Sequence, residues 1–414
     1  MKILFLSKYY KNYLNYFYST IKNDSNISYE ILYNKIIKDR YFWSDYFKQE
    51  LCTYGYFVEQ LIIDAKLLQI KWAEEHNYSY SEDTWYSDIV IEQIGFYKPD
   101  ILFIQDWAPE LGPKFVSFVK ETYPSIKMVV GYCGEGHPKP SYFKYHDLVI
   151  SCAKDNVEFF KKNNLCAYHI YHAFYPEIHN QLTFDYEKEY DVGFIGRIYP
   201  QSIFHEKRAL FLSDLSKISN FNIHGEIKSL KVYSLREKII NEIIYSFFQY
   251  FSLEIKKRSC IYKKNTEINL AVEKLYRIQK EQFFGLKMFD LIRRYKILIN
   301  YHTSPFFAAN LRMFEVTGMG TCLLTDWKEN IKELFEPDVE VVTYRNCHEA
   351  KEKIDFLKRN PDILINISLA GQKRTLKDHT YKNRAFDLHN IFNYFLKKKG
   401  GLFDACNHYK PMAS

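Results

Sequence analysis

The stretch from residue 295 to residue 337 concentrates side chains that can bind charged and hydroxylated ligands. Two apolar runs within it, residues 297–299 and 321–325, predict buried strands because both are short and bounded by polar groups or glycine. In an open parallel sheet, ligands bind outside the carboxyl ends of the strands. The polar residues that follow or separate these runs are therefore expected to line one crevice. They are Asn300, His302, Asn310, Arg312, Glu315 and Asp326.

These residue types suit a nucleoside diphosphate joined to a sugar. Arginine offers planar donors to phosphate oxygens, and backbone N–H groups at a Gly-rich turn or a helix N-terminus bind the same oxygens. A carboxylate such as Glu315 can accept two hydrogen bonds from a ribose diol. The alternative is that Arg312 and Glu315 pair with each other, because residues three apart on a helix are neighbours. Spacing alone leaves both interpretations open.

The order of residues here resembles a known signature. Asn310-Leu-Arg-Met-Phe-Glu-Val-Thr-Gly-Met-Gly-Thr321, then Leu-Leu-Thr-Asp326 and Glu-Leu-Phe-Glu-Pro337, is similar to the donor site of GT-B glycosyltransferases. It is most similar to the bacterial branch that includes spore-maturation glycosyltransferases. Weaker similarity covers most of the chain outside residues 227–285. It includes Leu68 to Trp72, Trp85, Pro99 to Asp106, Glu340 to Val342, Ala370 to Leu376 and His379 to Tyr381.

The resemblance implies an α/β protein of the GT-B fold, with two Rossmann-like domains whose parallel sheets face a central cleft. It assigns Glu315 to the ribose hydroxyls and Arg312 to phosphate or sugar. It also implies that four positions lie near the diphosphate. Two of them, Gly318 and Gly320, would let the backbone approach it closely. The four positions are Gly196, Arg197, Gly318 and Gly320.

The sequence departs from the family at one position. Many GT-B relatives carry a second Glu upstream of the one that matches Glu315, whereas residues 305–308 here are Pro-Phe-Phe-Ala. The group that contacts the donor sugar must therefore differ, and Asn310 or His302 is the expected substitute.

A general base for an acceptor hydroxyl is expected at the strand ends of the first domain, near the cleft. Asp106, Glu135 and His137 qualify by position. The alternatives are that His137 is an ordinary surface residue and that Asp106 caps the next helix. If the reaction retains anomeric configuration, no protein base is needed, because the leaving phosphate can take the proton.

A chain of 414 residues is too long for one ordinary core, so two domains are expected. Short apolar runs alternate with helical patterns, which predicts βαβ units and parallel sheets. We expect an acceptor-binding domain at 1–180, a nucleotide-sugar domain at 190–378, and a last helix at 381–398 that packs back on the first domain. Residues 7–18 are expected to form a polar and aromatic loop facing the acceptor.

Residues 227–285 are predicted to be a helical insertion in the second domain. One face of this insertion is apolar and has basic residues on both sides, which is typical of a helix at a membrane interface and would suit a lipid-linked acceptor. The alternative is packing on the second domain or on another subunit. The apolar positions are Ile240, Ile243, Ile244, Phe247, Phe251 and Ile255.

Composition and motifs indicate which partners, cofactors and locations to expect. The 57 basic and 50 acidic residues give a net charge of only +7, so nucleic acid is not an expected partner. The eight Cys are scattered without zinc spacing, which indicates reduced thiols and a cytoplasmic protein. No signal peptide or spanning apolar run is evident. Without an Asp-x-Asp motif, a Gly-x-Gly-x-x-Gly motif or a P-loop, we expect no metal and no cofactor.

These observations predict an enzyme that moves a sugar from a nucleotide-sugar donor to a saccharide hydroxyl.

 

The predicted acceptor is a glycan or lipid-linked saccharide of a cell-surface polysaccharide, reached from the cytoplasm or from the inner face of the membrane. Two alternatives stay open. The first alternative is a GT-B-fold epimerase or hydrolase of nucleotide sugars. The second is a sugar-binding or scaffold protein without activity.

Overall fold

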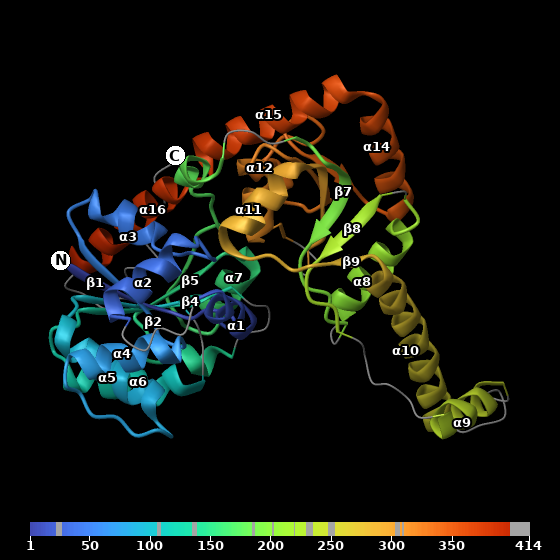
Figure 1. Cartoon of the computed structure of the whole chain (residues 1–414). Coiled ribbons are helices and arrows are strands. Elements are labelled where there is room, and N and C mark those ends of the chain that lie inside the picture. Colours follow the sequence, from blue (N-terminus) through green and yellow to red (C-terminus); the bar gives the residue numbers. More distant parts are fainter. Residues whose placement is uncertain are drawn as a thin grey trace.

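The structure is a computed structural model of the chain. It describes the following residues: 1–21, 27–105, 109–134, 139–183, 187–200, 203–218, 220–228, 235–246, 253–302, 307–308 and 310–397. Within them the chain forms two α/β domains, each built on one six-stranded sheet (Figure 1).

The first sheet has the strand order β2-β1-β3-β4-β5-β6, and all its neighbouring strands are parallel. Its strands are nearly continuous apolar runs because helices cover both faces of the sheet. Its strands are β1 (Lys2–Ser7), β2 (Phe57–Ile62), β3 (Ile101–Ile104), β4 (Met128–Cys133), β5 (Leu148–Ser151) and β6 (Ala167–His169). Its helices are α1 (Lys11–Thr20), α2 (Tyr29–Lys38), α3 (Tyr46–Cys52), α4 (Lys66–Glu75), α5 (Trp85–Tyr97), α6 (Pro113–Thr122) and α7 (Lys154–Lys162).

The second sheet has the order β12-β11-β10-β7-β8-β9, also parallel. Its strand order reverses between β7 and β10, and such a switch point is where open parallel sheets bind ligands. Its strands are β7 (Tyr190–Ile195), β8 (Phe221–His224), β9 (Gln279–Lys280), β10 (Tyr295–Asn300), β11 (Cys322–Asp326) and β12 (Val342–Tyr344). The helices that follow β7 are α8 (Ile203–Leu215), α9 (Leu235–Ser246), α10 (Leu253–Arg277), α11 (Gly285–Arg294), α12 (Leu311–Gly318), α13 (Ile331–Leu334), α14 (Cys347–Arg359), α15 (Pro361–Asp378) and α16 (Tyr381–Lys397).

The last helix, α16, returns to the first domain and packs against α3 (Figure 1). Leu388, Phe392 and Phe395 of α16 share one buried cluster with first-domain residues such as Phe47 and Val58. This apolar contact joins the two ends of the chain.

The expected loop at residues 7–18 is wrong for most of its length, because α1 begins at Lys11. Tyr13, Leu14 and Phe17 are buried on one side of this helix. Their spacing is helical, and the many tyrosines of the segment supply apolar area as well as a polar hydroxyl.

Residues 227–285 contain α9, α10 and the short strand β9. Ile268, Val272 and Leu275 of α10 are buried in the core of the second domain. On α9, Ile240 and Ile243 are exposed and Ile244 is partly buried. Of the other apolar positions expected on this face, Phe247 and Phe251 and the side chain of Ile255 lie outside the described residues.

Candidate functional site

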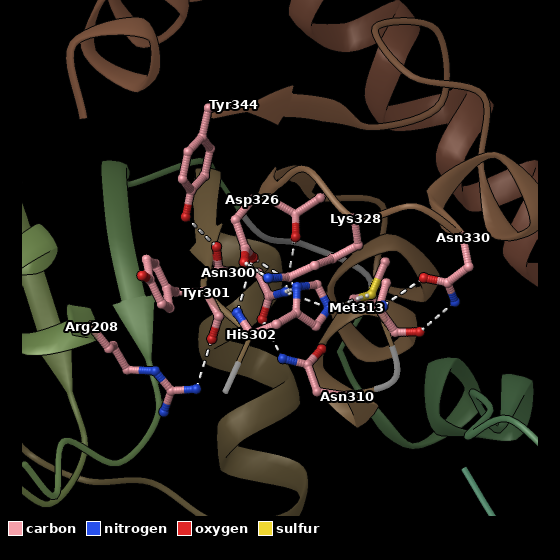
Figure 2. Close-up of polar contacts among 12 residues, drawn as sticks. Arg208, Asn300, Tyr301, His302, Asn310, Met313, Asp326, Lys328, Asn330 and Tyr344 are labelled. Atoms are coloured by element: carbon pink, nitrogen blue, oxygen red, sulfur yellow. Dashed lines mark hydrogen bonds and ion pairs between the residues drawn. The ribbon is translucent and has the colours of Figure 1, made fainter. Parts of the chain in front are cut away.

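A polar network lies at the carboxyl ends of β10 and β11, beside the switch point of the second sheet (Figure 2). Asn300 ends β10 and Asp326 ends β11, and both side chains are buried. The structure therefore brings together Asn300, His302, Asn310 and Asp326, as their positions after the strands predicted.

His302 and Asp326 form the centre of this network. His302 donates from its backbone N–H and from Nδ1 to the same oxygen, Asp326 Oδ1, at 2.9 and 2.7 Å. Lys328 Nζ lies 3.0 Å from the other carboxylate oxygen. Burial alone would raise the pKa of Asp326, but His302 and Lys328 outweigh it and hold that pKa below its usual value. The carboxylate is therefore ionised and fixed in orientation.

Three amide and hydroxyl groups continue the network. Asn310 Nδ2 donates to Asn300 Oδ1 at 2.6 Å, and Asn300 Nδ2 donates to Thr325 Oγ1 at 3.0 Å. Asn310 Oδ1 is buried and accepts no hydrogen bond from any described residue. A buried acceptor of this kind carries a desolvation cost that a donor group of a ligand would relieve.

Arg208 on α8 was not predicted and ties two strand ends together. Its guanidinium donates to the carbonyl of Arg197 at 3.0 Å. It also donates to the carbonyl of Tyr301 at 2.7 Å (Figure 2). Burial lowers its pKa to about 10, so it stays protonated at neutral pH. The sequence feature that could have indicated an inward-facing Arg208 is its position in α8, next to the buried Ala209 and one turn before the buried Leu212.

Gly196 and Arg197 form the turn after β7. The guanidinium of Arg197 lies over the ring of Tyr10, 3.7 Å from its centroid, so the turn contacts the first domain. Stacking uses the face of a guanidinium and leaves the donors along its edge for other groups. Beside this turn, a Cβ on Gly225 would lie 1.9 Å from the carbonyl oxygen of Gly196, so only glycine permits the approach.

Arg312 and Glu315 pair with each other on α12, with Nη1 and Oε2 2.7 Å apart. The pairing considered as the alternative is therefore present in this structure. Glu315 is buried, which raises the pKa of its carboxyl group against the opposing effect of Arg312. Its charge also contributes to the raised pKa of Tyr41 and Tyr46, after the larger effect of burial, so it lies on the side of α12 that faces the first domain.

The structure does not bring Gly318 and Gly320 to the network. Gly318 is the last residue of α12, roughly 10 Å along the helix axis from its start at Leu311. A Cβ on Gly318 would lie 2.3 Å from the ring of Phe174, and a Cβ on Gly320 would meet Gln372. These glycines allow close packing at the opposite end of the helix, and their expected position near a diphosphate stays a prediction.

The three candidates for a general base, Asp106, Glu135 and His137, lie outside the described residues. Among the residues that the structure describes, no group of three or more His, Cys, Asp or Glu side chains is arranged to hold a metal ion.

A further residue that was not predicted, Asn330, connects the network to the first domain. Its side chain bonds both backbone groups of Ala308, at 2.6 and 2.9 Å, and donates to the hydroxyl of Tyr171 at 3.0 Å. Beyond Tyr171, a pocket of about 690 Å³ lies between the two domains, lined by Lys154, His169 and residues of α15 and α16.

Comparison with known proteins finds a family that matches part of the chain. The family described as glycosyl transferase-like matches residues 263–390, a segment that contains the network from Asn300 to Lys328. None of the curated proteins matches the chain in sequence. The narrower resemblance to spore-maturation glycosyltransferases stays a prediction.

Three solved structures have a similar fold over nearly their whole length. Sucrose-phosphate synthase from Thermosynechococcus elongatus is 8% identical, with a TM-score of 0.52 over 95% of this chain and 98% of that one. A glycosyltransferase from Rickettsia africae is 12% identical, with a TM-score of 0.53 over 96% and 99%. HepE from Anabaena, solved with UDP and glucose, is 12% identical, with a TM-score of 0.53 over 95% and 99%.

At these identities the structural similarity shows the fold, which confirms the predicted pair of Rossmann-like domains. The chain therefore has the two-domain GT-B fold, and its residues 263–390 match the glycosyl transferase-like family.

Proposed function

We propose that the chain transfers a sugar from a nucleoside diphosphate donor, held by the second domain, to a saccharide hydroxyl held by the first. The observation that carries this proposal is the polar network at the switch point, with its buried acceptor Asn310 Oδ1. The complex of HepE with UDP and glucose supports a uridine diphosphate sugar as the first donor to test.

In the proposed complex, Asn310 Oδ1 accepts a hydrogen bond from a hydroxyl of the donor sugar. Asn300 fixes the orientation of this amide, because it accepts from Asn310 Nδ2. His302 and Asp326 hold the neighbouring strand ends in place. Glu315 binds the ribose hydroxyls when the donor opens its contact with Arg312.

The diphosphate would lie beside the turn after β7. Arg197 presents edge donors there, and Arg208 fixes the backbone of this turn and of Tyr301. In the transfer, the acceptor oxygen bonds to the anomeric carbon while the bond from that carbon to the diphosphate breaks. The electron pair leaves with the diphosphate, and protein cations stabilise the developing charge without a metal.

The proton of the acceptor hydroxyl passes to a base of the first domain or to the leaving phosphate. Asp106, Glu135 and His137 are the proposed candidates for that base. The proposed acceptor is a saccharide of a cell-surface glycan, and the proposed location is the cytoplasm.

The variant Asn310→Ala tests the donor site. Loss of one hydrogen bond to a buried amide costs about 1–3 kcal/mol, so kcat/KM for the donor should fall roughly tenfold to a hundredfold. The measurement is nucleoside diphosphate release from a panel of nucleotide sugars, with a panel of saccharide acceptors.

The matched control is Asn346→Ala, which removes the amide that accepts from Glu349 N–H at the start of α14. This variant should lose about 1 kcal/mol of stability and keep its kcat/KM. Undiminished transfer by Asn310→Ala would contradict the assigned role. Conversion of the donor without any acceptor would favour an epimerase or hydrolase.

A further inference from the structure

We propose that α9 and residues 253–264 of α10, together called the arm, dock on an anionic lipid bilayer. Figure 1 shows α10 projecting from the second domain with α9 at its far end. The inference goes beyond glycosyl transfer and does not depend on it.

The arm extends from a firm base. Ile268, Val272 and Leu275 are buried against α8, and Lys264 pairs with Glu206 of α8 at 2.5 Å. The turns of α10 before Lys264 therefore extend roughly 16 Å past this contact, at about 1.5 Å per residue.

The direction of this extension is set by α8. Arg208, one turn after Glu206, bonds the strand-end carbonyls of Arg197 and Tyr301. The N-terminal part of α8 therefore lies at the carboxyl edge of the sheet, where the candidate site is. Because Glu206 pairs with Lys264, the arm projects on that same side of the second domain.

The arm exposes large apolar side chains. Ile239, Ile240 and Ile243 on α9 are 53%, 40% and 54% exposed, and Ile261 on α10 is 57% exposed. The three positions on α9 occupy one face, because residues four apart lie one turn apart. Exposed isoleucines grouped in this way favour insertion into the boundary between lipid headgroups and acyl chains.

The positive charge of the arm indicates which kind of surface it binds. In sequence, the two helical segments of the arm, residues 235–246 and 253–264, contain seven Lys and Arg against three Asp and Glu. Basic segments beside an apolar face attract anionic lipid headgroups, each cation adding to the affinity. The described helices include none that is long and apolar enough to cross a membrane, so the contact would be interfacial.

The test is co-sedimentation of the full chain with vesicles of phosphatidylcholine alone or mixed with phosphatidylglycerol. The unmodified chain should bind the mixed vesicles at least about tenfold more tightly, and salt should weaken that binding. The triple variant Ile239→Asn, Ile240→Asn, Ile243→Asn should lower binding to mixed vesicles about tenfold.

The matched control is Ile363→Asn, Ile365→Asn, Leu369→Asn on α15, whose side chains are 40%, 51% and 57% exposed. It should bind vesicles like the unmodified chain. Circular dichroism and thermal unfolding of both triple variants establish that each is folded.

Equal binding to neutral and anionic vesicles, or full binding by the arm variant, would overturn the proposal. Light scattering gives a third outcome. An unmodified dimer that becomes a monomer in the arm variant would assign the isoleucines to a second copy of the chain and would also overturn it.

Discussion

His379 shows how one buried residue can make stability depend on pH. Arg384 Nη2 lies 3.0 Å from His379 Nδ1, and because arginine only donates, this nitrogen must be unprotonated. The other ring nitrogen then donates to the carbonyl of Leu334 at 2.8 Å. Burial, with a smaller contribution from Arg384, lowers the pKa of His379 to about 4.

The sign of the pH effect follows from this lowered pKa. Above pH 6.5 the ring is neutral in the folded and unfolded states, so it adds no pH dependence. Between pH 6.5 and 4 only the unfolded state takes up the proton, so the free energy of unfolding falls by about 3 kcal/mol in total. His379→Gln should remove this part of the acid sensitivity, measured by urea unfolding at several pH values.

His348→Gln is the control, because the side chain of His348 is 82% exposed. Its pH profile should match that of the unmodified chain. A profile for His379→Gln that still falls as steeply would show that the ring is already protonated in the folded state.

At the scale of elements, the site depends on how closely the turns after β7 and β8 approach. The N–H of Gly196 donates to the carbonyl of His224 at 3.0 Å, and Gly225 has a φ of +151°. This contact positions the turn that carries Arg197. The geometry of the proposed donor site is therefore set by the backbone as well as by polar side chains.

Gly225→Ala should disturb this contact. The added Cβ would overlap the carbonyl of Gly196, so the variant should lose about 2 kcal/mol more stability than a glycine replaced in open space. Its affinity for the nucleotide-sugar donor should fall as well. Urea unfolding and calorimetric titration measure the two effects.

Gly55→Ala is the matched control, since Gly55 has a φ of +80° with nothing within 4 Å of the added Cβ. It should show only backbone strain of about 1–2 kcal/mol and unchanged donor affinity. Equal stability losses in the two variants would contradict the role of close approach at Gly225.

At the scale of the whole molecule, several polar contacts join the domains in addition to the apolar packing of α16. Asn12 Nδ2 donates to Glu226 Oε2 at 2.6 Å, and Lys154 pairs with Glu333. Arg384 on α16 donates to the carbonyls of Tyr171 and His172 at 3.1 and 3.3 Å. These contacts hold the two domains at a defined separation.

Arg384→Ala should weaken this connection. Removing the guanidinium leaves partly buried carbonyls without this donor, so the free energy of unfolding should fall by about 2 kcal/mol. Hydrogen exchange should increase in residues 381–397. Arg359→Ala, which removes a contact on the exposed side of α14, should change stability by less than about 0.5 kcal/mol. Unchanged exchange in Arg384→Ala would contradict the connecting role of Arg384.

The sequence by itself determined the class of fold and the place of the polar network. Apolar runs of strand length, each ended by polar residues, predicted β3, β10 and β11 to within a residue or two because this periodicity belongs to contiguous residues. Parallel strands then placed Asn300, His302 and Asp326 at one edge.

Only the tertiary structure decided which of these polar groups have partners. Arg208 contacts the strand ends through the packing of α8, and Gly318 packs on Phe174, far away in the sequence. Likewise, α1 replaced an expected loop because its aromatic face found a core to cover. Such contacts join residues that are distant in the chain, so the local sequence pattern cannot predict them. They form only when both sheets are assembled.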